Sequence, residues 1–140
     1  MSICNSWEQK PNLDELLRLN TKDFTDLRRT LTSKGYELTN SGPGAYDVRS
    51  YKWVSNDETT QLFFRDEGNS TSLHLGPITF TEYNVIKKQL VTRGFKRLPY
   101  KNYNPDNFEF VNYKRGKIGV TFFITSRNEK NARYEVAVSD

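Results

Sequence analysis

The chain has very little cysteine and histidine: Cys4 and His74 are the only residues of their kinds among 140. A disulfide needs two cysteines and a cysteine-rich zinc site needs four ligands, so one chain can form neither. Nucleophilic catalysis by serine or by Cys4 would have to use His74 as its base. We interpret Cys4 as an unreactive residue and expect no catalytic residue, no metal and no cofactor.

Long apolar runs and the common catalytic motifs are also absent. No stretch approaches the roughly 18 apolar residues that cross a bilayer. The first six residues lack the apolar segment of a signal peptide. The sequence contains no G-x-S-x-G elbow and no H-E-x-x-H pair. We expect a soluble, non-enzymatic protein without a membrane span, either cytoplasmic or exported with a signal peptide that this sequence does not include.

Neither charge sign is in large excess, since 21 Lys and Arg against 17 Asp and Glu give a net charge of +4. A dedicated nucleic-acid-binding domain usually has a denser basic cluster and a defined motif. Hydrophobic residues make up 35% of the chain, but 14% of its residues are aromatic. Disordered chains lack such large side chains, so the composition predicts a small packed core.

The pattern of apolar residues predicts a short helix followed by two similar segments. Residues 12–19 form an amphipathic stretch that Asn12 can cap, with Glu15 in the position of a capping-box partner. We divide the single domain 1–140 into an N-terminal extension with this helix (1–20), a first α-β-β-β repeat (21–76) and a second (77–140).

An offset of 59 residues superimposes the two segments. Gly35 and Gly94 stand where each long helix is expected to end in a left-handed residue. The offset aligns apolar or aromatic residues of one predicted helix with apolar or aromatic residues of the other. It also aligns two pairs of adjacent phenylalanines. The aligned residues are Phe24 with Tyr83, Leu27 with Ile86, Leu31 with Leu90, and Phe63-Phe64 with Phe122-Phe123. We interpret the two segments as an internal repeat produced by duplication.

Each long helix is followed by three predicted strands. In the first segment these are residues 46–54, 59–65 and 72–75, and the second segment has matching signals that include 107–113 and 133–138. The connections between strands are short, which favours antiparallel hairpins over parallel winding. The predicted fold class is α+β: duplicated α-β-β-β units forming a mostly antiparallel six-stranded sheet, with two main helices on one face and the short N-terminal helix in addition.

Aromatic residues on both sides of a strand suggest a binding surface. Strand 46–54 places Ser50 and Lys52 on one side and Tyr51 and Trp53 on the other. Exposed Tyr and Trp are common interface anchors, although the leader helix or a loop could instead cover them. The loop 97–106 is rich in Pro and Tyr, unlike its Gly-rich counterpart. The candidate binding residues are Tyr51, Trp53, Arg97, Tyr100, Lys101 and Tyr103.

Nucleic-acid binding is the alternative hypothesis. Its candidate contacts are Arg28, Arg29, Lys87 and Lys88, which occupy equivalent positions on the two helices and could lie close together in a duplicated fold. Basic residues mixed with aromatic residues on a sheet are typical of base stacking. His74 alternates with Leu73 and Leu75, so it should face away from the core and lie at the surface.

The segment Leu13-Asp14-Glu15-Leu16-Leu17-Arg18-Leu19-Asn20, followed by a helix ending at Lys34-Gly35-Tyr36, resembles a loose class of small, exported bacterial proteins of unassigned function. The similarity covers about the first 40 residues. It implies export and a non-enzymatic role, and it transfers no functional residue. The sequence as a whole therefore predicts a binding or interaction module for a protein partner, by fold-level analogy an inhibitor or an immunity-type protein.

Overall fold

The computed structural model describes residues 10–20, 23–43, 49–99, 108–125 and 132–140. The helices in these ranges are α1 (Leu13–Leu19), α2 (Phe24–Ser33) and α3 (Phe80–Thr92). The strands are β1 (Tyr36–Pro43), β2 (Arg49–Ser55), β3 (Gln61–Asp66), β4 (Thr71–Ile78), β5 (Lys96–Arg97), β6 (Phe108–Arg115), β7 (Ile118–Thr125) and β8 (Arg133–Ser139). None of the described helices is long and apolar enough to cross a membrane.

The strands form one sheet in the order β1-β2-β3-β4-β8-β7-β6-β5, with antiparallel neighbours throughout. The predicted α+β class and antiparallel sheet are confirmed. The predicted number of six strands is wrong, because the described residues already form eight. The two additional strands are β1 and β5, which follow the two long helices.

The two extra strands gave weak sequence signals. Gly35 and Gly94 end their helices with φ of 86° and 82°, as predicted, and the chain then turns into β1 and β5. β1 continues through Thr39-Asn40-Ser41-Gly42-Pro43, which looks like a loop. An edge strand hydrogen-bonds to one neighbour only and therefore tolerates polar residues and proline. β5 has two residues, too few to form a recognisable pattern.

The last strands of the two segments meet at the centre of the sheet. β4 pairs with β8, with Leu73 opposite Val138 and Leu75 opposite Val136. The segments α2–β4 and α3–β8 therefore contain the same order of elements, each running from one edge of the sheet to its middle. Whether this arrangement arose by duplication stays a prediction.

The two aromatic doublets do not correspond in the way that the offset of 59 predicted. Phe64 pairs with Tyr51 and is 2% exposed, whereas Phe63 is 43% exposed. In the second doublet the first residue, Phe122, is fully buried and Phe123 is partly exposed. The alignment of the doublets is wrong by one residue, because strand alternation makes Phe64 the counterpart of Phe122.

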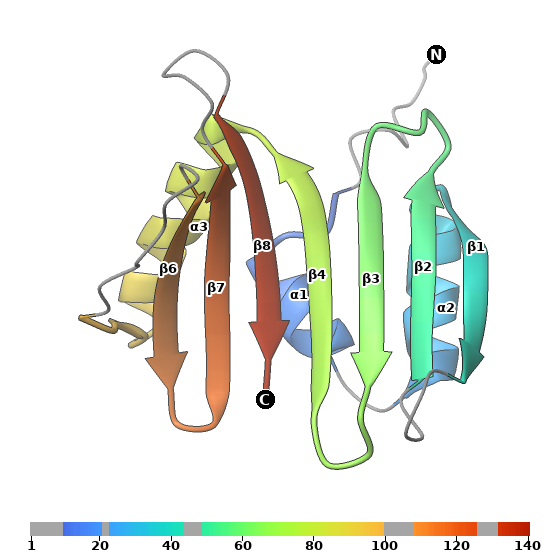
Figure 1. Ribbon diagram of the computed structural model, residues 1–140, viewed down its shortest axis with the longest axis horizontal. Helices are drawn as coiled ribbons and strands as arrows, with labels where there is room; N and C mark the ends of the chain where they lie inside the picture. The colour runs from blue at the N-terminus through green and yellow to red at the C-terminus, as the bar shows by residue number, and fades with distance from the viewer. Residues whose placement is uncertain (1–9, 21–22, 44–48, 100–107, 126–131) are drawn as a thin grey trace.

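All three helices lie on one side of the sheet, and Figure 1 views the sheet from the other side. The Phe24 ring of α2 lies 4.3 Å from Tyr51, and the Tyr83 ring of α3 lies 4.8 Å from Phe122. We call this side of the sheet the covered face and the opposite side the free face. The core lies between the covered face and the helices, and its fully buried members include Trp53, Leu62, Phe64, Leu73, Leu75, Val120, Phe122, Val136 and Val138.

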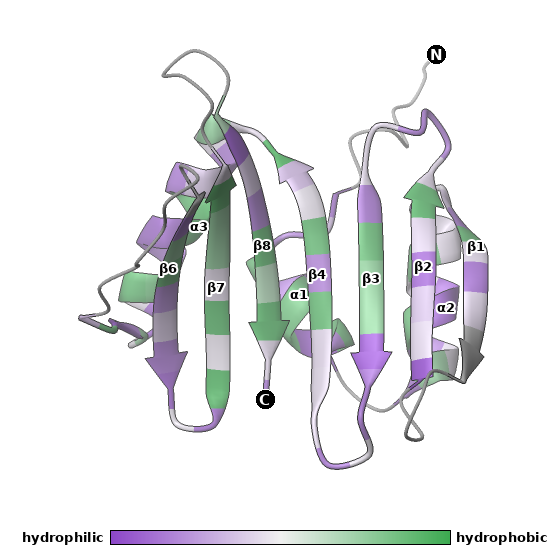
Figure 2. Cartoon of the chain, in the orientation of Figure 1, coloured by the Kyte–Doolittle hydropathy of each residue, from purple (hydrophilic) through white to green (hydrophobic). Residues whose placement is uncertain are grey.

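The short helix α1 fills the space between the two longer helices, behind β4 (Figure 1). Leu13, Leu16 and Leu19 are buried, and the predicted capping box between Asn12 and Glu15 is confirmed. A helix of this length is stable only when it is docked. On the strands, Figure 2 shows hydrophobic residues over the middle of β3 and along most of β7.

Candidate functional site

The structure places the predicted anchors of strand β2 on the covered face. Trp53 is 1% exposed and lies 6.3 Å from Phe24, measured between ring centroids. Tyr51 is half-buried beneath the same helix residue. The residue that covers them belongs to helix α2, not to the leader helix or a loop that the sequence suggested as possible cover. Trp53 is therefore a core residue with no surface to offer a partner.

Of the other predicted binding residues, the structure describes only Arg97. Arg97 is exposed at the end of this strand, next to Leu98, which is 39% exposed. Tyr100, Lys101 and Tyr103 lie outside the described residues. Among the predicted binding residues that the structure describes, Arg97 is therefore the one that is exposed.

The four basic helix residues are not brought together. α2 and α3 lie at opposite ends of the sheet (Figure 1), so Arg28 and Arg29 are far from Lys87 and Lys88. The expected convergence is wrong because the two segments meet through β4 and β8, which leaves their helices apart.

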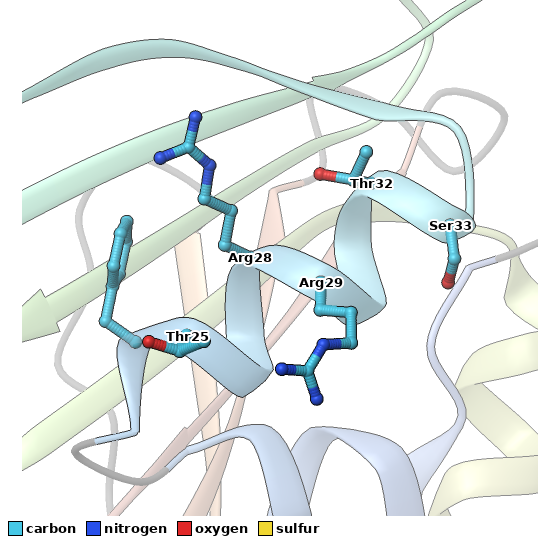
Figure 3. Close-up of a pocket in the computed structure, with 6 residues that line it drawn as sticks. Thr25, Arg28, Arg29, Thr32 and Ser33 are labelled. Carbon is cyan, nitrogen blue, oxygen red and sulfur yellow. The ribbon is translucent and has the colours of Figure 1, made fainter.

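Arg28 and Arg29 also diverge from each other. They line one surface hollow along α2 together with Phe24, Thr25, Thr32 and Ser33, but their guanidinium groups point in different directions (Figure 3). On α3, the Lys87 ammonium lies 4.6 Å from the centroid of the Tyr83 ring. Neither pair of basic residues forms a focused anion site.

The free face carries a group of aromatic residues that sequence reasoning did not single out. His74 of β4 stacks on Phe123 of β7, with ring centroids 4.9 Å apart and an interplanar angle of 23°. Phe63 contacts His74 edge-on at 6.4 Å, and Phe110 contacts Phe123 edge-on at 5.2 Å. We call these four residues, Phe63, His74, Phe123 and Phe110, the aromatic band.

A small residue makes room for the stacked pair. β8 lies between β4 and β7, and Ala137 is the residue opposite both His74 and Thr121. The methyl group of Ala137 is short enough for the rings of His74 and Phe123 to meet above it. The aromatic band consequently extends without interruption from β3 to β6, across four strand spacings or roughly 19 Å.

Polar contacts fix the centre of the band. His74 Nε2 lies 2.8 Å from Glu135 Oε1, a hydrogen bond in which the imidazole N–H donates to the carboxylate. Arg133 Nε lies 3.4 Å from the other carboxylate oxygen. Gly76 makes this arrangement possible, because a Cβ atom there would lie 2.6 Å from Glu135 Cγ. The prediction that His74 faces away from Leu73 and Leu75 is confirmed.

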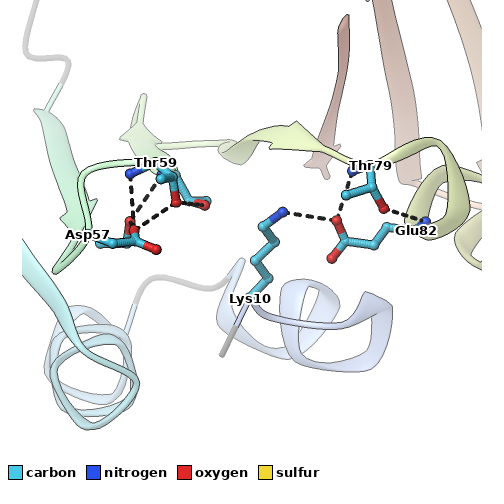
Figure 4. Close-up of polar contacts among 7 residues, drawn as sticks. Lys10, Asp57, Thr59, Thr79 and Glu82 are labelled. Carbon is cyan, nitrogen blue, oxygen red and sulfur yellow. Dashed lines mark hydrogen bonds and ion pairs between the residues drawn. The ribbon is translucent and has the colours of Figure 1, made fainter. Parts of the chain in front are cut away.

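The carboxylates with lowered pKa values are explained by turns and helix caps (Figure 4). Hydrogen bonds from Ser55 and Thr59 lower the pKa of Asp57 to about 2. Burial alone would raise the pKa of Glu82, but the backbone N–H of Thr79 and the ammonium of Lys10 outweigh burial and lower the pKa. Asp66 caps the next turn by accepting from the Gly68 N–H at 2.8 Å. These groups hold elements together.

No group of three His, Cys, Asp or Glu side chains within the described residues is placed to hold a metal ion. The carboxylate of Glu135 is already engaged by His74 and Arg133. What the free face offers is an apolar strip with a fixed polar centre.

No protein-family model matches this chain, and the comparisons with curated proteins and with solved structures found no match.

The signal for the aromatic band was present in the sequence. Each phenylalanine doublet lies within a strand, so one of its rings must leave the core. The sequence did not reveal which one, because helix placement decides which face is covered.

Proposed function

We propose that this chain is a non-enzymatic binding module whose free face docks a protein partner. The observation that carries the proposal is the aromatic band, with Phe63 43% exposed on a face that the described helices leave open. Large contiguous apolar patches on a protein surface often mark interaction sites. Aromatic residues surrounded by polar ones are also typical of interface cores.

The orientation of the rings favours a protein over nucleic acid. Base stacking needs an aromatic ring with an open face. In the aromatic band His74 and Phe123 cover one face of each other, and Phe63 and Phe110 meet their neighbours edge-on. A carboxylate, Glu135, lies at the centre of the band, where it would repel a phosphate backbone.

Nucleic-acid binding through the basic helix faces remains the alternative proposal. The observation in its favour is that Arg28 and Arg29 are both exposed beside one hollow on α2. This alternative predicts affinity for oligonucleotides that falls steeply with salt, because bound phosphates release counterions. A more specific form of the protein-binding proposal is that the chain acts as an inhibitor or an immunity-type protein.

The test is to capture partners from a lysate of the source organism with the wild-type protein and two variants. Phe63→Ala with Phe123→Ala removes two rings of the aromatic band. Phe80→Ala removes a ring that is 60% exposed on α3 and serves as the matched control. We expect a discrete protein that the wild type and the control retain and the double variant loses, with affinity reduced by roughly 30-fold or more.

Circular dichroism and urea unfolding of each variant establish that it is folded. A partner that all three proteins retain equally would exclude the free face as its docking surface. Recovery of nucleic acid alone, lost in Arg28→Gln with Arg29→Gln, would replace the proposal with its alternative.

A further inference from the structure

Two lysines face each other at one end of the free face. Lys96 of β5 is directly opposite Lys114 of β6, and both side chains are exposed. Like charges in directly opposed cross-strand positions are destabilising. Neither lysine forms an ion pair with any of the described residues. Among the described residues the pair therefore leaves two positive charges uncompensated, one of them on β6, the strand that carries Phe110 and Asn112.

The free face as a whole has a net positive charge, and Lys96 and Lys114 supply most of it. Strand registers place five basic and two acidic side chains there. They are Lys52, Arg65, Lys96, Lys114 and Arg133, against Glu37 and Glu135. Glu135 is bound by His74 and Arg133, and Arg65 pairs with Glu67 at 3.0 Å.

The remaining positive charges lie at the two ends of the aromatic band. Lys114 lies on β6, four residues along the strand from Phe110, and Lys96 is opposite it on β5. At the β3 end, the Lys52 ammonium lies 5.7 Å from the centroid of the Phe63 ring. The free face thus has an apolar middle, two lysines toward its β6 side, and at its β3 side one lysine with Glu37 of β1 further out.

We infer that the partner is an acidic protein surface, with apolar side chains that contact the aromatic band and carboxylates that reach Lys96 and Lys114. This inference rests on the proposed function, because it names the chemistry of the partner on the same face. Carboxylates placed at the band's ends complement the lysines without approaching Glu135. A nucleic-acid strand would instead carry phosphates across the whole band.

An edge-protecting role is the competing explanation of the lysines. Lysine on an edge strand discourages pairing with other chains, and β5 is an edge strand. Lys114 lies on β6, one strand in from the edge, where no such protection is needed. The two explanations differ in what happens to binding when both charges are removed.

The experiment selects binders from a displayed library of random peptides, using the full-length wild-type protein as bait. Peptides that Phe63→Ala with Phe123→Ala fails to bind are retained as free-face binders. We expect these peptides to combine Asp or Glu with bulky apolar residues. Their dissociation constants are then measured by isothermal titration calorimetry against Lys96→Gln with Lys114→Gln. We expect a loss of roughly 3- to 10-fold at low salt that shrinks as salt is added.

A matched control removes two charges elsewhere. Arg29→Gln with Lys88→Gln changes the net charge equally on exposed helix positions, and it should leave peptide affinity unchanged. The Lys96/Lys114 variant should unfold at the same or a higher urea concentration than the wild type, because a like-charge pair has been relieved. If the lysine variant binds the peptides more weakly but is as stable as the wild type, the two lysines contribute to partner binding and not to folding.

The outcomes separate the inference from the proposed function. Free-face peptides of neutral or basic composition, or acidic ones that bind the lysine variant equally well, would overturn the inference and leave the docking face intact. Selection of no peptide that depends on Phe63 and Phe123 would overturn both. Tight binding of a labelled single-stranded oligonucleotide that is lost in the lysine variant would assign the cationic end to nucleic acid instead.

Discussion

Two neighbouring rows of residues, one on each face of the sheet, show how differently the two faces are constrained. Both rows cross the same six strands, from β2 to β6, one residue apart in sequence. On the covered face the row is Trp53, Leu62, Leu75, Val136, Phe122 and Val111. On the free face it is Lys52, Phe63, His74, Ala137, Thr121 and Asn112.

Every residue of the covered row is apolar and buried. The free row contains a cation, a phenyl ring, an imidazole, a methyl group, a hydroxyl and an amide. Packing under the helices accepts any apolar side chain of suitable volume and excludes other types. The free face has no such requirement, so its aromatic residues need another explanation, and partner contact is the one we propose.

The largest expected effect comes from adjacent phenylalanines on β7. Phe122→Ala should lower the free energy of unfolding by about 3–5 kcal/mol, because it opens a cavity among Tyr83, Tyr113 and the covered row. Phe123→Ala should cost about 1 kcal/mol, since its ring is partly exposed and loses mainly its contacts with His74 and Phe110. Urea unfolding of both variants measures the difference. Equal losses would show that the two faces are not distinct in packing.

A smaller effect is expected at the centre of the free face. Gly76→Ala adds a Cβ atom 2.6 Å from Glu135 Cγ, and the flexible glutamate must leave His74. Loss of the hydrogen bond should lower the free energy of unfolding by about 1 kcal/mol. Alanine also makes the unfolded chain less flexible than glycine does, which should raise the same free energy by about 0.4–1 kcal/mol, so stability should change little. The measurement is the ¹⁵N chemical shifts of the His74 imidazole, which report hydrogen bonding at Nε2.

Gly119→Ala is the matched control for this substitution. Its Cβ would lie 3.1 Å from the Ser139 hydroxyl on the same face, away from His74. The His74 shifts should move in the Gly76 variant and stay constant in the control. Unchanged shifts in both would mean that Glu135 reaches His74 by another path and that Gly76 is not needed.

The smallest expected effect is a loss of folding stability at low pH. Asp57 and Glu82 support the turn between β2 and β3 and the start of α3, and both have a lowered pKa in the folded protein. A lowered folded pKa contributes stability above the unfolded pKa, and this stability is lost as pH falls. For Asp57 the loss should fall between pH 3.8 and about 2. The Asp57→Asn variant should have a shallower slope of unfolding free energy against pH in this window, and an unchanged slope would refute the assignment.

Much of the local structure could be predicted from the sequence. Apolar spacing located the three helices, and the predicted capping box of Asn12 with Glu15 formed. The glycines that end the long helices have the expected positive φ. Strand alternation correctly assigned Tyr51 and Trp53 to one side of β2 and Lys52 to the other. Each of these signals depends on residues within a few positions of one another.

The candidate site was harder to predict for a physical reason. The sequence pointed to Tyr51 and Trp53 because large aromatic residues are common anchors, but helix α2 covers both. The aromatic band depends on contacts between residues far apart in the chain, such as His74 with Phe123 and with Glu135. No local pattern indicates that two such residues will come together across the sheet.

Sequence alone therefore determined the periodicity, the caps, the helix ends and the division of each strand into two sides, because short-range sterics and hydrogen bonds set these features. Only the tertiary structure decided that β4 pairs with β8, that Lys96 faces Lys114, and that the helices cover the side of Trp53 rather than that of Phe63. Alternation is symmetric between the two sides of a strand. The choice between them is made by which long-range packing buries the most apolar surface.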